Sequence, residues 1–318
     1  MSTFGKHLSP VTLKIYLVLL FCLLSGLISA SAQQKAIYTQ YMFNGLTINP
    51  AYSAMDEAFT VTALSRHQWV GFKGAPNTQT LSAYSHIGES NTSVGGFLIR
   101  DQIGEVLNEK GAYLTLAQQV EIGDGTYLAV GFNGGISSYQ ANFSDDYPYS
   151  PESVNDPVFN NEHNTRGNFG FGVMLFSGSY YAGFSSPHFY YRDLNSFGGA
   201  AATKYRPYYM LQGGYLYTIS DGLKLRPSVL FKYVNGSPLQ FDLNANLLIS
   251  ERLWLGASYR SLDSFDAIAQ LYITDNIALG YSFDFVTTKL VKAQRGTHEI
   301  SLQFRFPVLG RDFPRCYF

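Results

Sequence analysis

Between positions 223 and 285 the chain alternates apolar and polar residues with a period of two, five times in succession. This period places alternate side chains on opposite faces of a β-strand. The turns between the five segments are only a few residues long, and connections that short join antiparallel neighbours. The pattern therefore predicts an antiparallel meander of five strands, at 223–233, 239–249, 253–260, 265–273 and 277–285.

A weaker form of the same alternation predicts eight strands before the meander and one after it, which makes fourteen in total. These nine segments are 57–68, 78–87, 92–101, 110–121, 126–141, 166–177, 179–186, 205–219 and 297–306. Taken alternately, the connections are mostly short on one side and mostly long on the other, as in bacterial outer-membrane barrels. Pro227 interrupts one predicted strand, and because proline has no N–H to donate it predicts a bulge or a strand end.

The apolar face of such a sheet fits either a protein core or lipid, and the start of the chain helps to decide. Residues 1–32 have the features of a secretory signal: Lys6 and Lys14, an apolar run at 15–28, and small residues up to Ala32. The run is shorter than the roughly 20 residues of a membrane-spanning helix. We expect cleavage after Ala32, which leaves Cys316 as the only cysteine and excludes an internal disulfide.

Composition favours lipid rather than a protein core as the surroundings of the apolar face. Charged residues make up 14% of the chain, against roughly 25% in ordinary soluble domains, while Tyr and Phe number 24 each. A barrel in lipid needs an outward apolar band with aromatic girdles. Loss of Lys6 and Lys14 leaves 20 basic against 23 acidic residues, a balance too mild to indicate nucleic acid as a partner.

We therefore expect an all-β fold, a transmembrane antiparallel up-and-down β-barrel of about 14 strands in the outer membrane of a Gram-negative cell, surrounded by the lipid bilayer. The barrel would span 57–306, preceded by an N-terminal plug-like segment at 33–56 and followed by a tail at 307–318.

The segment 33–56 has turn signals at Asn44-Gly45 and Asn49-Pro50. Between them lie too many apolar and aromatic residues for a solvated leader. Two interpretations stay open: a segment packed on the first strands, or a plug or lid that folds into the mouth of the barrel.

The charged residues in the five meander strands and the closing strand share the polar face. Each of these groups is expected to point inward, because Arg or Lys facing lipid costs about 2–4 kcal/mol at the bilayer midplane. They are Lys224, Arg226, Lys232, Asp242, Arg260, Asp266, Asp284, Glu299 and Arg305. Their signs nearly balance. A one-sign ring is expected of a selective pore, whereas mixed signs suit cross-strand pairing, so we predict a paired and at least partly filled lumen in which these residues are wall scaffold.

No pattern in the chain indicates catalysis, a metal site or a cofactor. None of the histidines lies beside a second ligand at metal-binding spacing. Ser85 and His86 are chain neighbours and would point to opposite faces of a strand, so they do not form a nucleophile and base. We expect a non-enzymatic protein without cofactors.

Three stretches resemble the PorP/SprF family of type IX secretion system membrane proteins. The opening stretch carries Tyr38, Gln40, Tyr41, Met42, Phe43 and Asn44, followed by Asn49, Pro50 and Tyr52. A second stretch carries Arg66, Gln68, Trp69, Gly71 and Pro76, a candidate loop motif. The third is the closing strand around 298–302.

The resemblance implies an outer-membrane accessory of type IX secretion that supports export or surface attachment of a specific adhesin, including gliding adhesins. Its partners would be the C-terminal signal domain of that adhesin and other secretion components. Our hypothesis that the opening motif forms a plug or docking element comes from its aromatic, turn-rich sequence and from the balanced lumen charges. One departure is the tail of twelve residues after Phe306: either it tucks back or Phe318 replaces the usual terminal strand signal. The alternatives are a porin-like or hydrophobic-ligand channel, whose lumen fourteen strands are wide enough to enclose, and a secreted soluble β protein.

Overall fold

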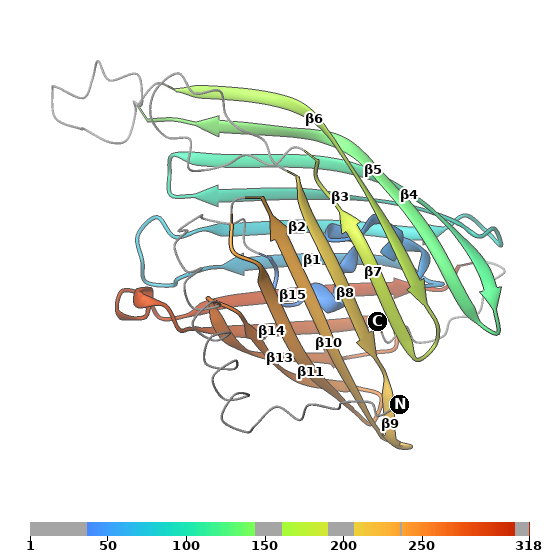
Figure 1. Ribbon diagram of the computed structural model, residues 1–318. Coiled ribbons are helices and arrows are strands. Elements are labelled where there is room, and N and C mark those ends of the chain that lie inside the picture. The colour runs from blue at the N-terminus through green and yellow to red at the C-terminus, as the bar shows by residue number, and fades with distance from the viewer. Residues whose placement is uncertain (1–36, 144–160, 190–206, 236, 309–317) are drawn as a thin grey trace, which may run out of the picture.

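The computed structural model describes residues 37–143, 161–189, 207–235, 237–308 and 318, and its strands form one closed antiparallel barrel (Figure 1). The strands are β1 (Phe59–His67), β2 (Asn77–His86), β3 (Thr92–Ile103), β4 (Leu107–Gly123), β5 (Thr126–Ala141), β6 (Glu162–Phe176), β7 (Tyr180–Ser186), β8 (Tyr208–Tyr215), β9 (Tyr217–Ser220), β10 (Leu223–Val234), β11 (Gln240–Ile249), β12 (Leu253–Arg260), β13 (Ser264–Tyr272), β14 (Ile277–Val286) and β15 (Thr297–Phe306). Short 3-10 helices are η1 (Tyr41–Phe43), η2 (Gly45–Thr47), η3 (Pro50–Ala54) and η6 (Lys289–Lys292).

The barrel closes between its first and last strands. Phe59 lies opposite Phe306 and His67 opposite His298, so β1 and β15 pair along their whole length. Strands β8 and β9 both pair with β10 and together make one wall strand that is interrupted at Leu216. The wall therefore has fourteen strands, which confirms the number that the alternation predicts.

The interruption lies beside Pro227, where the sequence predicts an irregularity. On the side of β8 and β9, the pairing of β10 is interrupted between Ser228, opposite Gly214, and Leu225, opposite Tyr217. Because Pro227 has no N–H, it cannot donate to this neighbour. Leu216 leaves the alternation here and turns into the barrel, where it is buried.

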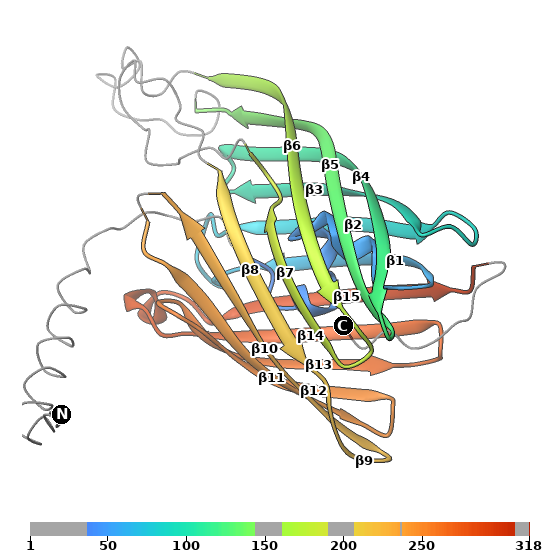
Figure 2. The same ribbon diagram turned by 45° about the vertical axis from the view of Figure 1, so that its right-hand side comes forward.

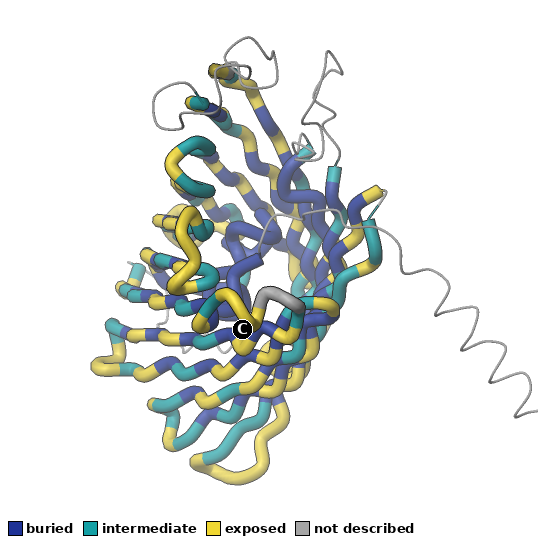
Figure 3. Tube along the Cα trace, turned by 90° about the vertical axis from the view of Figure 1, so that its left-hand side faces the viewer, coloured by how far each residue is buried: buried dark blue, intermediate teal, exposed yellow. Residues whose placement is uncertain are grey.

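Burial alternates along each strand (Figure 3). Apolar side chains such as Leu114, Phe132 and Phe285 are 76%, 60% and 57% exposed on the outward face, while the inward face is polar and buried. This is the reverse of a soluble protein and fits lipid outside. Within the described ranges, no helix combines the length and hydropathy needed to cross a bilayer.

Three predicted connections differ from the structure or lie mostly outside the described residues. The loop predicted at 102–109 is shorter, because β3 and β4 extend and leave only residues 104–106 between them. The predicted signal at 1–32 lies outside the described residues, as do 33–36 and most of the loops predicted at 142–165 and 187–204. Of the tail, residues 307, 308 and 318 are described, and Phe318 returns to the barrel interior.

Candidate functional site in the barrel interior

Residues 37–54, which include η1, η2 and η3, lie inside the barrel and are all buried (Figures 2 and 3). Leu46, Asn49 and Ala51 have no exposed surface at all. The segment contacts strands all around the wall, and it is defined here as the inner segment. All the opening-motif side chains that the sequence singles out lie within it: Tyr38, Gln40, Tyr41, Met42, Phe43, Asn44, Asn49, Pro50 and Tyr52.

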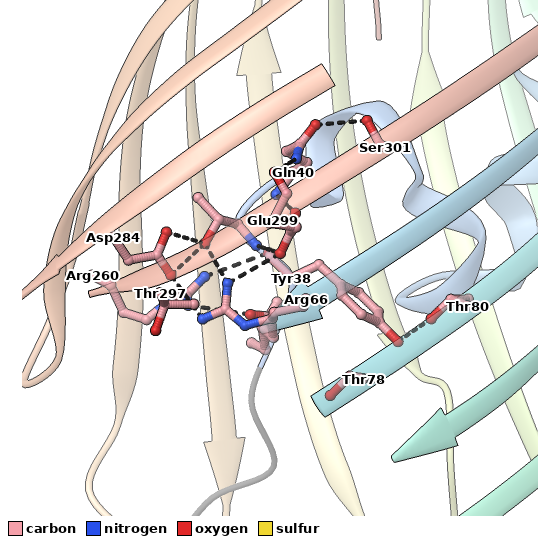
Figure 4. Close-up of polar contacts among 12 residues, drawn as sticks. Tyr38, Gln40, Arg66, Thr78, Thr80, Arg260, Asp284, Thr297, Glu299 and Ser301 are labelled. Carbon is pink, nitrogen blue, oxygen red and sulfur yellow. Dashed lines mark hydrogen bonds and ion pairs between the residues drawn. The ribbon is translucent and has the colours of Figure 1, made fainter. Parts of the chain in front are cut away.

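Glu299 on β15 binds the start of the inner segment. The backbone N–H groups of Thr39 and Gln40 donate to its two carboxylate oxygens at 3.0 and 2.8 Å. The Gln40 side chain donates to the Glu299 main-chain oxygen at 3.2 Å and accepts from Ser301 Oγ at 2.7 Å (Figure 4). Buried backbone donors need partners, and here a wall carboxylate supplies them.

Arg66 joins this carboxylate to a second strand. Its guanidinium lies 2.8 Å from Asp284 on β14 and 3.1 Å from Glu299, and it donates to Thr39 Oγ1 at 2.9 Å. Thr39 Oγ1 in turn donates to Asp284 at 2.9 Å. Four side chains from three strands and the inner segment therefore form one network, because the planar guanidinium can serve several acceptors at once.

Two further arginines bind the ends of the inner segment. Arg260 forms a cross-strand pair with Asp242 at 2.9 Å and also donates to the Ile37 main-chain oxygen at 3.2 Å. Arg305 binds Asp56 at 2.6 Å, at the point where the segment enters β1. The start of the segment and the residues just after its end are thus held to the wall by charge-assisted hydrogen bonds, which are stronger than neutral ones.

Aromatic residues fill the space between these ends. Asn244 donates to Tyr41 Oη at 2.6 Å, and burial raises the pKa of Tyr41 well above its ordinary value. Phe43 packs against Trp254 with ring centroids 6.2 Å apart, and the Arg226 guanidinium lies 4.5 Å from the Trp254 ring centroid. The result is an apolar cluster with a cation over its aromatic face.

The second half of the motif binds the opposite wall. Asn49 Oδ1 accepts from the Ala51 N–H at 3.0 Å and caps η3, while its Nδ2 donates to the Val173 main-chain oxygen at 3.3 Å. Pro50 occupies the first position of η3, where its missing N–H costs nothing. Tyr52 packs edge-on against Tyr84 and donates to the Phe318 main-chain oxygen at 2.7 Å.

Glycines on the inward face of β5 and β6 make room for η3. Gly131 and Gly172 are cross-strand partners. A Cβ at Gly131 would lie 2.4 Å from the Ala51 nitrogen, and one at Gly172 would lie 2.0 Å from Asn49 Oδ1. The backbone of the inner segment approaches Gly131 this closely, and the capping Asn49 side chain approaches Gly172, so a larger residue at either wall position would displace η3.

The predicted lumen charges all lie on the inward face. Among the described residues, the buried charged groups are five basic and five acidic: Arg66, Arg226, Lys232, Arg260, Arg305, Asp56, Asp242, Asp266, Asp284 and Glu299. Lys224 is nearer the rim and pairs with Glu251 at 2.7 Å, and Lys232 lies 5.7 Å from the Tyr208 ring centroid. Three of the five basic groups form ion pairs with buried carboxylates: Arg66 and Arg260 across strands, and Arg305 with Asp56. The inner segment carries no charge itself and is bound through hydrogen bonds to these charged groups.

The predicted loop motif divides into two parts. Arg66 lies in β1, within the strand predicted at 57–68, and its side chain joins the interior network rather than the loop. The remaining residues order the loop at 68–76: the Gln68 N–H donates to the Pro76 oxygen at 3.0 Å, and the Trp69 N–H to Thr297 Oγ1 at 3.2 Å. Gly71 has a φ of 93°, a conformation that favours glycine.

Sequence reasoning missed Thr39, Asp56 and the glycine pair. Asp56 lies just before a strand that begins three residues later, a position where a carboxylate commonly caps local backbone, and it accepts from the Ala58 N–H at 3.2 Å. Its partner Arg305 lies 249 residues away, a separation that no local pattern reveals. In the parts of the chain that the structure describes, no three His, Cys, Asp or Glu side chains are grouped as metal ligands.

Comparison with known proteins gives one family. A family model described as type IX secretion system membrane protein PorP/SprF matches residues 30–304. A search of curated proteins gave no match.

Among solved structures, the chain resembles the Acinetobacter baumannii outer membrane protein Omp33 at 11% identity and a TM-score of 0.46, covering 80% of this chain and 100% of that one. It also resembles a Pseudomonas aeruginosa FadL homologue at 12% identity and a TM-score of 0.48, covering 83% and 94%. A third is the CymD monoaromatic hydrocarbon channel, at 11% identity and a TM-score of 0.49, covering 87% and 95%.

Proposed function

Since the chain belongs to the PorP/SprF family of type IX secretion system membrane proteins, we propose that it is a non-enzymatic outer-membrane accessory of that system, supporting export or surface attachment of one adhesin. In this proposal the inner segment is a permanent plug, and the protein acts through its rim and loops. The partners are the C-terminal signal domain of the adhesin and other secretion components.

The observation that carries the proposal is the complete burial of residues 37–54 among wall residues. Leaving a buried hydrogen-bonding group without its partner costs about 1–3 kcal/mol, and more when the group is charged. Displacing the inner segment would separate Thr39 and Gln40 from Glu299, and Ile37 from Arg260, in a single step. A cost of this size favours a segment that stays in place, so that cargo does not pass through the barrel.

The loop at 68–76 is the described surface best suited to a partner. It is held at its base by the hydrogen bonds of Gln68 and Trp69, while Val70 and Phe72 are 37% and 46% exposed at the rim. Exposed apolar side chains on a rigid base are typical of protein docking sites. We assign this loop to contact with the secretion machinery.

Gene deletion in the host tests the cargo assignment. We expect one adhesin to accumulate inside the cells while other type IX cargo is released normally, and the wild-type gene to restore its display. A Phe72→Ser variant should restore display less well than wild type at equal protein level. Normal display of every adhesin after deletion would contradict the proposal.

A reversible disulfide between the inner segment and the wall, called the lock below, tests whether the segment stays in place. Ser53 Oγ on η3 lies 3.0 Å from Ser93 Oγ on β3, so Ser53→Cys and Ser93→Cys bring two thiols within bonding range. The background carries Cys316→Ser, which removes the only other cysteine of the chain after position 32. We expect the oxidised lock to support adhesin display as well as its reduced form does, and loss of display on oxidation alone would contradict a permanent plug.

A further inference from the structure

The outward face of the barrel carries a depression of about 730 Å³ that the inner segment does not explain. Its lining comes from β15, β1, β2, β3, β4 and β5, and its outward side chains include Ala63, Leu81, Leu98, Ala112 and Ile136. These residues lie in one cross-strand row, because Ala63 pairs with Leu81, Leu81 with Leu98, Leu98 with Ala112 and Ala112 with Ile136. The depression exists because Ala63 and Ala112 are small, and the side chains of this row make its surface apolar.

The next outward row toward the β3–β4 connection is polar and basic. It runs Ser65, Gln79, Arg100, Lys110 and Ser138, again as successive cross-strand partners, and all of them line the depression. The change from an apolar row to a polar one marks the boundary of the lipid band. The depression therefore spans this boundary, with an apolar floor and a basic rim.

Arg100 and Lys110 are unusual for this surface. Among the described strand residues, alternation places all the remaining formal charges on the inward face. Arg100 and Lys110 are the two that face outward. They lie directly opposite each other on β3 and β4, and like charges in that arrangement repel. Arg100 donates to Gln102 at 3.0 Å, which is a neutral acceptor and leaves the positive charge of the pair uncompensated.

We infer that this depression binds a phosphate-bearing lipid of the outer leaflet, with the phosphate between Arg100 and Lys110 and an acyl chain along Leu81 and Leu98. The charge complementarity favours an anion, since guanidinium and ammonium groups bind phosphate well. The apolar floor, continuous with the lipid-facing wall, favours an anion that carries acyl chains. The β3–β4 connection lies at the end of the longer loops, which in outer-membrane barrels face outward, so the lipid belongs to the outer leaflet.

Lipid binding to the purified full chain in detergent tests the inference, with monophosphoryl lipid A as the probe and native mass spectrometry as the readout. We expect retention of the lipid by the wild type and binding at least about tenfold weaker for the Arg100→Gln, Lys110→Gln double variant. Ala112→Phe, which fills the hollow, should also weaken binding. Arg252→Gln is the matched control, because Arg252 is an exposed base in a turn at the other end of the barrel.

The remaining outcomes overturn the inference. Equal retention by the wild type and the double variant would exclude a role for the basic pair, and unchanged binding by Ala112→Phe would exclude the hollow. Displacement of the lipid by an equal concentration of inorganic phosphate would indicate an anion site without lipid recognition. The substituted side chains face outward, and the variants are expected to fold. Folding is checked by unchanged electrophoretic migration of unheated samples. The single Arg100→Gln variant replaces the double variant if that one fails to fold.

Discussion

Arg66 is the single residue on which the attachment of the inner segment depends most. It contacts Asp284, Glu299 and Thr39 while only 2% exposed. Replacement by alanine leaves two buried carboxylates without their cation, and we expect Arg66→Ala to lower the free energy of unfolding by about 3–5 kcal/mol. The measurement is the urea midpoint of the barrel in detergent.

The control for this prediction is Arg252→Ala, which removes an exposed base and should change the same free energy by no more than about 0.5 kcal/mol. Arg66→Lys keeps the charge but loses the planar fork, so its midpoint should fall between the wild type and Arg66→Ala. Equal midpoints for Arg66→Ala and Arg252→Ala would show that the network does not stabilise the fold.

The role of Arg66 also shows where sequence reasoning stops at the residue scale. Alternation places Arg66 inside the strand predicted at 57–68. Its motif neighbours Gln68 and Trp69 lead into a loop, however, and nothing local shows that the Arg66 side chain binds the barrel interior instead. Its acceptor Glu299 lies 233 residues away and becomes a neighbour only when β15 closes the barrel on β1. Charge balance in the lumen could be predicted from alternation, but the individual partners could not.

Strand β5 offers a matched test of the space that the inner segment needs. Gly131 faces inward, where a Cβ would meet the Ala51 backbone at 2.4 Å, whereas a Cβ at Gly134, which lies on the outward face, would have nothing within 4 Å. We expect Gly131→Val to displace η3 and to speed chymotrypsin cleavage at Tyr41 and Tyr52 by at least about tenfold, because cleavage follows the population of the open form.

Gly134→Val should leave the cleavage rate at Tyr41 and Tyr52 near that of the wild type, since it adds the same side chain to the same strand away from the segment. If both variants were cleaved as slowly as the wild type, close packing of η3 on β5 would be excluded as the cause of its protection.

At this scale the strands themselves were predictable from the period of two, since the pattern reports directly which side chains face lipid. The break between β8 and β9 was partly predictable from Pro227. The position of the inner segment was not, because aromatic residues such as Tyr41 and Phe43 fit a segment packed on the wall and a plug equally well. Only the three-dimensional closure of the wall, with Gly131 beside Gly172, shows the space that η3 occupies.

For the whole molecule, the assignment of lipid as the outer solvent can be measured at one wall position. Leu243 lies near the middle of β11 and is 50% exposed on the outward face. Leu243→Arg should make folding into phosphatidylcholine vesicles less favourable by about 2–4 kcal/mol if this position lies near the midplane. Leu262→Arg, in the turn after β12, is the control and should cost about 0–1 kcal/mol; equal costs at both positions would contradict a lipid band around β11.

The filled interior is the central claim, and planar-bilayer conductance of the purified mature chain tests it most directly. A variant that lacks residues 33–55 but keeps Asp56, the partner of Arg305, provides the comparison, with its folding checked by the migration of unheated samples. We predict no stable conductance from the intact mature chain and a stable open level after removal of the segment. A stable open level from the intact chain would contradict the account.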